Sequence, residues 1–171
     1  MTKIMILFFL ILTTASCEKN EALKYIQISD FNWSVLDSLQ YKNGSLSSTL
    51  DFSFPHILYV TSNECAECIF NFIKFHKSTS KIEGDIRYIY IITGYDDIAF
   101  KYYLRENGVQ FKDNMYLIMD SLDVFYQNMS KYLGNQMFVL KGREEVIQLL
   151  SNPIKNDEML ERFGKMINKG E

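Results

Sequence analysis

Hydrophobic residues follow one another along the chain in two different patterns. Residues His56 to Thr61, Ile86 to Thr93 and Met115 to Met119 form short, nearly continuous apolar runs. Runs of this length predict β-strands that are buried on both faces of a sheet. After the first run, residues 62–64 (Ser, Asn and Glu) are cap-type residues. Apolar residues from Ile69 to Phe75 then recur at roughly helical spacing, up to a polar break at residues 78–80. The pattern therefore predicts a strand, a helix and a second strand in succession.

Polar caps and glycines divide the rest of the chain into further elements. These predicted elements are a helix that Asp96 and Asp97 can cap and that runs through Tyr102 to Arg105, a helix from about Leu122 to Leu133, a hairpin of Met137–Leu140 and Glu145–Leu150, and a last helix that contains Met159, Leu160, Phe163, Met166 and Ile167. Gly108 and Gly134 stand where the end of a helix prefers glycine. The segment from Lys24 to Phe54 has mixed patterns and suggests only one strand, at residues 25–29.

Strands that alternate with helices, followed by a hairpin and a final helix, predict an α/β domain. Its mixed central sheet is expected to carry helices on both faces. The chain has 171 residues and is 47% hydrophobic, which is enough for one domain, residues 24–171, with a sizeable core. Its formal net charge is −3, and no cluster of Lys and Arg alternates with aromatic residues. The composition therefore argues against a surface that binds nucleic acid.

The first 17 residues have the order of an export signal. Lys3 precedes an apolar run from Ile4 to Leu12, small residues follow, and the segment ends at Cys17. The apolar run is too short for a transmembrane helix, which needs about 20 apolar residues. Residues 1–16 are therefore predicted to be a signal peptide.

Small residues directly before a cysteine resemble a bacterial lipobox, with Thr14 at the position where this motif usually has leucine. The resemblance implies that Cys17 is lipidated and becomes the first residue of the mature chain, with residues 17–23 as a tether. The domain would then be anchored to a membrane of the bacterial cell envelope and face the periplasm. Ordinary cleavage near Ala15 and a retained N-terminal anchor are the alternatives.

Cys65 and Cys68 form a Cys-x-x-Cys motif at the junction between the first long predicted strand and its helix. In an exported protein such a pair is a redox centre, a structural disulfide or part of a metal site. A tetrahedral zinc site needs four ligands, and only His56 and His76 remain to complete one. His76 follows Cys68 by about two helical turns and is expected at the surface, and His56 is expected to be structural. We therefore expect no metal and no cofactor.

The order of elements resembles the thioredoxin fold: a buried strand, a Cys-x-x-Cys motif at the next helix start, a βαβ unit, a hairpin and a last helix. The helix and strand between Asp96 and Met119 are similar to the insertion found in membrane-anchored thiol-disulfide oxidoreductases and redoxins. The resemblance covers about residues 50–168. It implies that Cys65 attacks a partner disulfide, that Cys68 resolves the mixed disulfide, and that the partners are exported proteins bearing thiols or disulfides.

The spacing suits this chemistry, because two cysteines on the first turn of a helix can close a small ring with little movement of the backbone. Free N–H groups and the positive end of the helix dipole favour the thiolate of Cys65. Glu64 stands where the family usually has tryptophan, and Ala66 and Glu67 stand where a proline-containing pair is common. We expect the two carboxylates to raise the pKa of the thiol, which favours a reductant over a strong oxidant. The alternative is that both are only solvated residues of the helix start.

Two further features of the family are absent from the sequence. Tyr59 and Asn71 occupy the positions of carboxylates that relay protons in the relatives, and neither can act as an ionised relay. Asn135 or Gln136 occupies the position of a cis-proline whose backbone holds the substrate peptide. A cis bond without proline costs about 2.5 to 4 kcal/mol, so we expect a trans or reshaped loop and a different substrate docking. These departures support an alternative function, a non-catalytic binding module on a thioredoxin scaffold.

Overall fold

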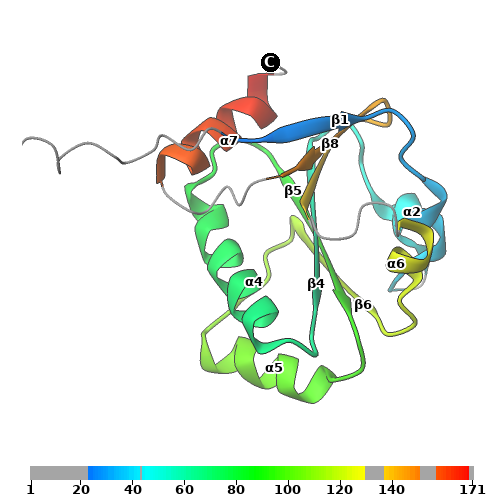
Figure 1. Ribbon diagram of the computed structural model, residues 1–171, viewed down its shortest axis with the longest axis vertical. Coiled ribbons are helices and arrows are strands. Elements are labelled where there is room, and N and C mark those ends of the chain that lie inside the picture. Colours follow the sequence, from blue (N-terminus) through cyan, green and yellow to red (C-terminus); the bar gives the residue numbers. More distant parts are fainter. Residues whose placement is uncertain (1–22, 43, 130–136, 151–156, 170–171) are drawn as a thin grey trace, which may run out of the picture.

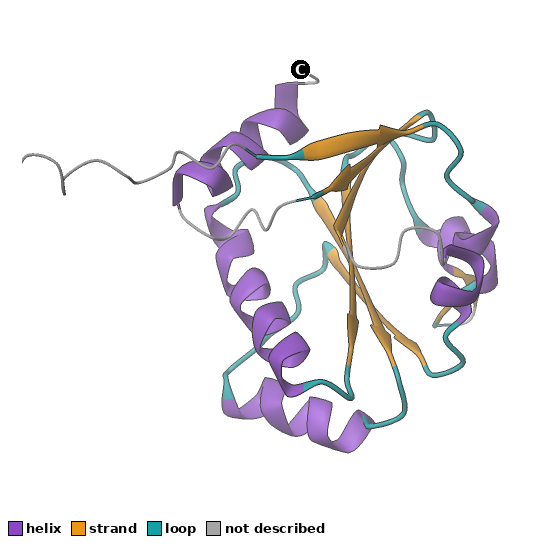
Figure 2. Ribbon diagram, viewed as in Figure 1, coloured by secondary structure: helices purple, strands orange, loops and turns teal. Residues whose placement is uncertain are grey.

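The computed structural model describes residues 23–42, 44–129, 137–150 and 157–169. The strands are β1 (Tyr25–Ile28), β2 (Gln40–Tyr41), β3 (Gly44–Ser45), β4 (His56–Ser62), β5 (Arg87–Thr93), β6 (Met115–Asp120), β7 (Met137–Lys141) and β8 (Glu145–Leu149). The helices are α2 (Ser34–Ser38), α3 (Leu46–Thr49), α4 (Ala66–Ser78), the 3₁₀ turn η1 (Thr79–Lys81), α5 (Asp97–Glu106), α6 (Val124–Met129) and α7 (Asp157–Lys169). Figures 1 and 2 show the sheet between two groups of helices, with α4, α5 and α7 on one side and α2 and α6 on the other.

Six strands form one mixed sheet in the order β1-β8-β7-β4-β5-β6, and β2 pairs with β3 in a small separate sheet. The central strand β4 pairs in parallel with β5 and antiparallel with β7, and β5 pairs in parallel with β6. The carboxyl ends of the three parallel strands therefore lie at the same end of the sheet, the lower end in Figure 1. In open α/β sheets, ligands and reactive groups gather at the carboxyl ends of the strands.

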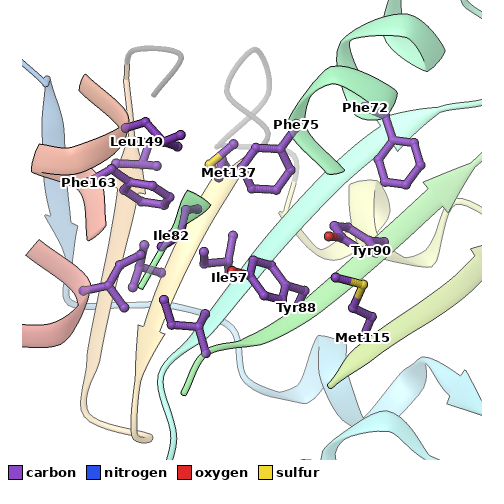
Figure 3. Close-up of a cluster of buried hydrophobic side chains, with 14 of the residues drawn as sticks. Ile57, Phe72, Phe75, Ile82, Tyr88, Tyr90, Met115, Met137, Leu149 and Phe163 are labelled. Atoms are coloured by element: carbon purple, nitrogen blue, oxygen red, sulfur yellow. The ribbon is translucent and has the colours of Figure 1, made fainter. Parts of the chain in front are cut away.

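Alternate residues of the central strands face two different cores. Ile57 and Tyr90 belong to the cluster beneath α4, α5 and α7, whereas Leu58 and Ile89 belong to the cluster beneath α2, α3 and α6. Figure 3 shows part of the first cluster, in which the ring of Phe72 from α4 lies 5.0 Å from that of Tyr90. Because both faces of β4 and β5 are covered, these strands are apolar at almost every position.

The predicted α/β domain, with its mixed sheet and helices on both faces, is confirmed, and the long strands and the hairpin end within one residue of the predicted limits. The helix predicted from about Leu122 begins two residues later, at Val124. Asp120 explains this start, because its carboxylate oxygens accept hydrogen bonds from the backbone N–H groups of Val124 and Phe125 at 2.9 and 2.8 Å. Residues 130–133 of this predicted helix lie outside the described residues.

The segment from Lys24 to Phe54 contains more structure than its mixed pattern indicates. The strand candidate at residues 25–29 is β1, which pairs antiparallel with β8 at the sheet edge. The short helices α2 and α3 bury Val35, Leu36 and Leu46 against the second cluster. Helices of four or five residues are too short to produce a periodic pattern, so tertiary contacts rather than local sequence define them. Among the described helices, none combines the length and apolar character that crossing a bilayer requires.

Candidate functional site

Cys65 lies in the turn between β4 and α4 and is the N-cap residue of α4. Its backbone is extended, with φ −117° and ψ 111°, and its Sγ accepts a hydrogen bond from the backbone N–H of Cys68 at 3.3 Å. The sequence suggested residues 62–64 as the cap, but the sulfur itself takes this role. A thiol at the cap position faces the free N–H groups and the positive end of the helix, which stabilise a thiolate.

Cys68 lies one helical turn beyond Cys65. Both residues are partly exposed free cysteines. The Cys68 thiol donates a hydrogen bond to the Cys65 sulfur, and this bond, together with that from the Cys68 backbone, lowers the pKa of Cys65. Burial, the same sulfur–sulfur hydrogen bond and the negative charge of Cys65 raise the pKa of Cys68 to about 11. The site therefore favours the thiolate at Cys65 and keeps the proton on Cys68.

The expectation that carboxylates beside the pair raise the pKa of Cys65 is confirmed for the charge of Glu67. This charge has the smallest influence on the sulfur, and hydrogen bonds lower the pKa of Cys65 overall. The Glu64 carboxylate instead accepts a hydrogen bond from the backbone N–H of Tyr95 at 3.2 Å. Hydrogen bonds act on the sulfur at contact distance, whereas the exposed Glu67 carboxylate is screened by water, so the hydrogen bonds decide the direction.

Asn63 connects the cysteine turn to the loop between β5 and α5. Its side chain is buried, and its Nδ2 lies 3.4 Å from the carbonyl oxygen of Gly94 and 3.4 Å from Oδ1 of Asp97. Its Oδ1 accepts the backbone N–H of Asp96 at 3.2 Å. Gly94 has φ +99°, and a Cβ there would lie 2.4 Å from Asn63 Oδ1. Only glycine fits this close approach, which holds the turn with Cys65 against the neighbouring loop.

Two buried threonines support the turn of α4 that carries Cys68. Thr61 Oγ1 donates a hydrogen bond to the Cys68 carbonyl at 3.3 Å, and Thr93 Oγ1 donates to the Thr61 carbonyl at 3.3 Å. From α6 on the other face of the sheet, Tyr126 forms a hydrogen bond with the Thr93 side chain. Burial, and to a smaller extent the charge of Cys68, raise the pKa of Tyr126. The cysteine pair is therefore supported by side chains from both faces of the sheet.

Tyr59 and Asn71 are the residues that the family resemblance aligned with proton-relaying carboxylates. The ring of Tyr59 stacks on Phe75 with centroids 4.8 Å apart. Burial and the charge of Cys68 raise the pKa of Tyr59 to about 12. The phenol thus keeps its proton at neutral pH and cannot accept one from Cys68, in agreement with the sequence-based expectation that neither position provides an ionised relay.

The two histidines lie away from the cysteine pair or inside the core. His56 is fully buried at the start of β4, six residues before the end of the strand, and burial lowers its pKa to about 4. His76 is 8% exposed, and its Nε2 lies 3.0 Å from the Gln110 carbonyl oxygen. The prediction that His76 is a surface residue is therefore wrong, because it lies four residues after Phe72 on the buried face of α4. Within the described ranges, no three His, Cys, Asp or Glu side chains gather so that they could hold a metal ion.

Three residues singled out in the sequence, Cys17, Asn135 and Gln136, lie outside the described residues. Their predicted roles in lipidation and substrate docking therefore stay predictions. Sequence reasoning noted Asn63 only as a possible cap, although a buried polar residue directly after a strand is also a candidate for a loop clamp. It missed Tyr126, which is 58 positions from Cys68 in the chain and has no local pattern that connects it to the pair.

No protein-family model and no curated protein matches the sequence. Among solved structures, a secreted Mycobacterium tuberculosis disulfide oxidoreductase homologous to E. coli DsbE is similar with a TM-score of 0.54 and 13% identity, over 78% of this chain and 98% of that chain. MTB dsbF, solved in mixed oxidised and reduced forms, has a TM-score of 0.53 and 12% identity, over 79% and 98%. A putative electron transport protein from Aquifex aeolicus VF5 has a TM-score of 0.49 and 16% identity, over 74% and 87%. The first two similarities show that the chain has a thioredoxin-like fold.

Proposed function

We propose that this protein is a thiol-disulfide oxidoreductase of the bacterial cell envelope that reduces or exchanges disulfides in exported proteins through Cys65 and Cys68. One observation carries the proposal: the Cys65 sulfur caps α4, accepts the Cys68 N–H at 3.3 Å and remains partly exposed. A structural disulfide needs neither a lowered pKa nor an accessible sulfur, whereas a nucleophilic thiolate needs both. A metal site needs further ligands, which the described surroundings of the pair do not provide.

The proposed reaction consists of two thiol-disulfide exchanges. The Cys65 thiolate attacks one sulfur of the partner disulfide, the S–S bond of the partner breaks, and the first partner thiolate leaves and takes a proton from water. Cys68 then loses its proton to water and attacks the Cys65 sulfur of the mixed disulfide. The Cys65–Cys68 disulfide forms, and the second partner sulfur leaves as a thiolate and takes a proton from water, so two electrons have passed from the dithiol to the partner. A second dithiol must return the pair to its reduced form.

The pKa difference between the two thiols orders these steps. Part of the raised pKa of Cys68 comes from the charge and the hydrogen bond of Cys65. Both disappear when Cys65 is consumed in the mixed disulfide, so Cys68 becomes easier to ionise when it has to attack. Because Tyr59 keeps its proton, water rather than this side chain is the proposed acceptor of the Cys68 proton.

The direct test uses the full-length chain with Cys17→Ser, so that the pair supplies the only thiols. Reduction of a peptide disulfide is measured with dithiothreitol as donor. We expect turnover for this protein, complete loss in Cys65→Ser, and a trapped mixed disulfide in Cys68→Ser, detected as a mass increase equal to one half of the partner. Turnover that survives Cys65→Ser would refute the assignment. A reduction potential measured on the same protein decides the direction of exchange.

Lipid anchoring through Cys17 is a separate part of the proposal and rests on the N-terminal sequence. We expect the protein to incorporate labelled palmitate when it is produced in a bacterium, and Cys17→Ser to abolish the label and release the protein from membranes. Labelling that persists in Cys17→Ser would contradict this anchor without affecting the redox assignment.

A non-catalytic binding module remains the second candidate, because the position of the substrate-holding proline is Asn135 or Gln136. This candidate predicts that a Cys65→Ser, Cys68→Ser double variant binds its partner as well as the unaltered protein. The enzyme predicts instead that covalent capture of the partner disappears in the double variant.

A further inference from the structure

Helix α5 has two apolar faces, and only one of them is used by the core. Phe100 and Leu104 are buried against the sheet. On the opposite side Ile98 and Tyr102 are four positions apart within the helix, which places them on one face, and Tyr95 lies directly before the N-cap residue Asp96. Their exposed fractions are 72%, 85% and 51%. These three residues, here called the apolar strip, contribute little to the stability of the fold.

The apolar strip begins next to the reactive thiol. The backbone N–H of Tyr95 donates to Glu64, the residue directly before Cys65, at 3.2 Å. The buried Asn63 holds this loop against the cysteine turn through Asp96 and Gly94. The strip is therefore held in a fixed position relative to Cys65, and a partner that presents its disulfide to the sulfur must lie close to the strip.

The charge at the thiol and at the start of the strip is negative. Residues 62–73 and 94–100 contain Glu64, Glu67, Asp96 and Asp97 but no Lys or Arg. Cations follow further along α5, where the Arg105 guanidinium lies 5.8 Å from the centroid of the Tyr102 ring. Asp97 is paired with Lys101 at 3.7 Å, while Glu64, Glu67 and Asp96 are exposed. A cationic group next to the partner disulfide would complement this surface, and an anionic group would be repelled.

The position of the thiol favours a polypeptide partner over a small molecule. Clefts of about 610, 460 and 180 Å³ occur in the described part of the chain, and neither cysteine lines any of them. Small ligands are normally bound in concave pockets, whereas an extended peptide can lie across a surface and bury separate side chains. Two copies joined through the strip would bring like charges together, and an anionic membrane would be repelled by the same carboxylates.

We propose that the apolar strip docks a polypeptide that carries an apolar residue and a Lys or Arg close to its disulfide. This inference rests on the proposed function, because the strip selects which disulfide Cys65 attacks. Tyr95, whose N–H is bound to Glu64, and Ile98 determine specificity, and Glu64 supplies the charge that attracts the cation.

The test compares three disulfides with the full-length chain in the Cys17→Ser background. They are a peptide disulfide with Phe and Lys beside each cysteine, a peptide of equal length with Ser and Glu at those positions, and glutathione disulfide. We expect kcat/KM to be highest for the first. A Tyr95→Ser, Ile98→Ser double variant should lower it about tenfold for the first peptide and leave glutathione disulfide unchanged. Ile26→Ser is the matched control. Ile26 is also exposed, at 44%, but it lies in the edge strand β1, on the opposite side of the sheet from β5 and β6, which α5 connects.

The outcomes separate this inference from the proposed function. If the unaltered protein reduces none of the disulfides, the proposed function fails. If it reduces all of them and the double variant is unaffected, the docking strip is refuted while the enzyme stands. Glu64→Gln should reduce the preference for the Lys peptide over the Glu peptide, and an unchanged preference would refute the role of this charge. A dimer, or binding to phospholipid vesicles, that the double variant loses would assign the strip to another occupant and overturn the inference.

Discussion

The two ends of β4 carry the titratable side chains that the sequence singles out, and the fold treats them in opposite ways. At the start of the strand, His56 is fully buried beside the ring of Phe52, with centroids 5.5 Å apart. After its end, Cys65 is partly exposed at the N-terminus of α4. The pKa values of both groups are lowered, but for different reasons: burial at His56 and hydrogen bonds at Cys65.

The same direction of shift has opposite chemical consequences at the two ends. A lowered pKa keeps the histidine neutral. His56 is therefore a core residue that gains no proton at ordinary pH. A lowered pKa keeps the cysteine charged, so Cys65 becomes the stronger nucleophile at neutral pH. The comparison of the two ends of β4 shows when a pKa shift indicates function. The cause of the shift must stabilise the reactive form of the group, and the reactive atom must be accessible.

The largest expected effect is the acid sensitivity that His56 confers on the fold. Its pKa is about 4 in the folded protein and about 6.5 when unfolded, so between these values the unfolded chain binds a proton that the folded chain does not. Stability is therefore lost as pH falls from about 6.5 towards 4, by about 3 kcal/mol in total. Urea unfolding at pH 7 and 4.5 measures this loss, and His56→Leu should reduce it by most of that amount. Equal pH dependence in both proteins would mean that His56 is not desolvated.

The next effect concerns the glycine that joins the cysteine turn to the neighbouring loop. Gly94→Ala adds a Cβ at φ +99°, where it would lie 2.4 Å from Asn63 Oδ1. We expect a loss of about 2 kcal/mol or more in the free energy of unfolding. Gly108→Ala is the matched control, because its φ is +63° and open space surrounds it, so only the backbone cost of about 1 kcal/mol remains. Equal losses in the two variants would show that the close approach to Asn63 is not a constraint.

A smaller effect distinguishes the two thiols. With a lowered pKa at Cys65 and one of about 11 at Cys68, alkylation by iodoacetamide at pH 7.5 should be at least about tenfold faster at Cys65, after the lower nucleophilicity of its thiolate is allowed for. Peptide mapping by mass spectrometry gives both rates. In Cys65→Ser, alkylation of Cys68 should become faster, because the charge that raises its pKa is gone. An unchanged Cys68 rate would contradict the coupling.

The smallest expected effect comes from Glu67, whose carboxylate opposes the thiolate of Cys65. Glu67→Gln should move the alkylation midpoint of Cys65 to lower pH and change the rate at neutral pH by no more than about fivefold, since the charge is exposed. Glu64→Gln should leave the midpoint unchanged, because the Glu64 carboxylate is directed to the Tyr95 N–H. A larger shift in Glu64→Gln than in Glu67→Gln would reverse our assignment of the two carboxylates.

The predictions from the sequence succeeded where local pattern and burial have the same cause. The continuous runs at β4, β5 and β6 were recognisable because strands covered on both faces need apolar residues at every position. The position of Cys65 at the strand-to-helix junction followed from the same pattern. Asp96 was also recognised as a cap, and its Oδ1 accepts the Ala99 N–H at 3.0 Å. Where elements are short, as in α2 and α3, the pattern carried no information.

The sequence by itself determined the order of the long strands and helices and the placing of two thiols one turn apart, since both depend on spacing along the chain. Only the tertiary structure decided the electrostatics of the site. The loop after β5 brings the Tyr95 N–H to the Glu64 carboxylate. This carboxylate therefore binds the loop, although its sequence position suggested that it would raise the pKa of Cys65. Packing of α4 against the sheet likewise buried His76, which the sequence-based prediction placed at the surface. Hydrogen bonds and desolvation depend on distances between residues far apart in the chain, and spacing along the sequence does not contain those distances.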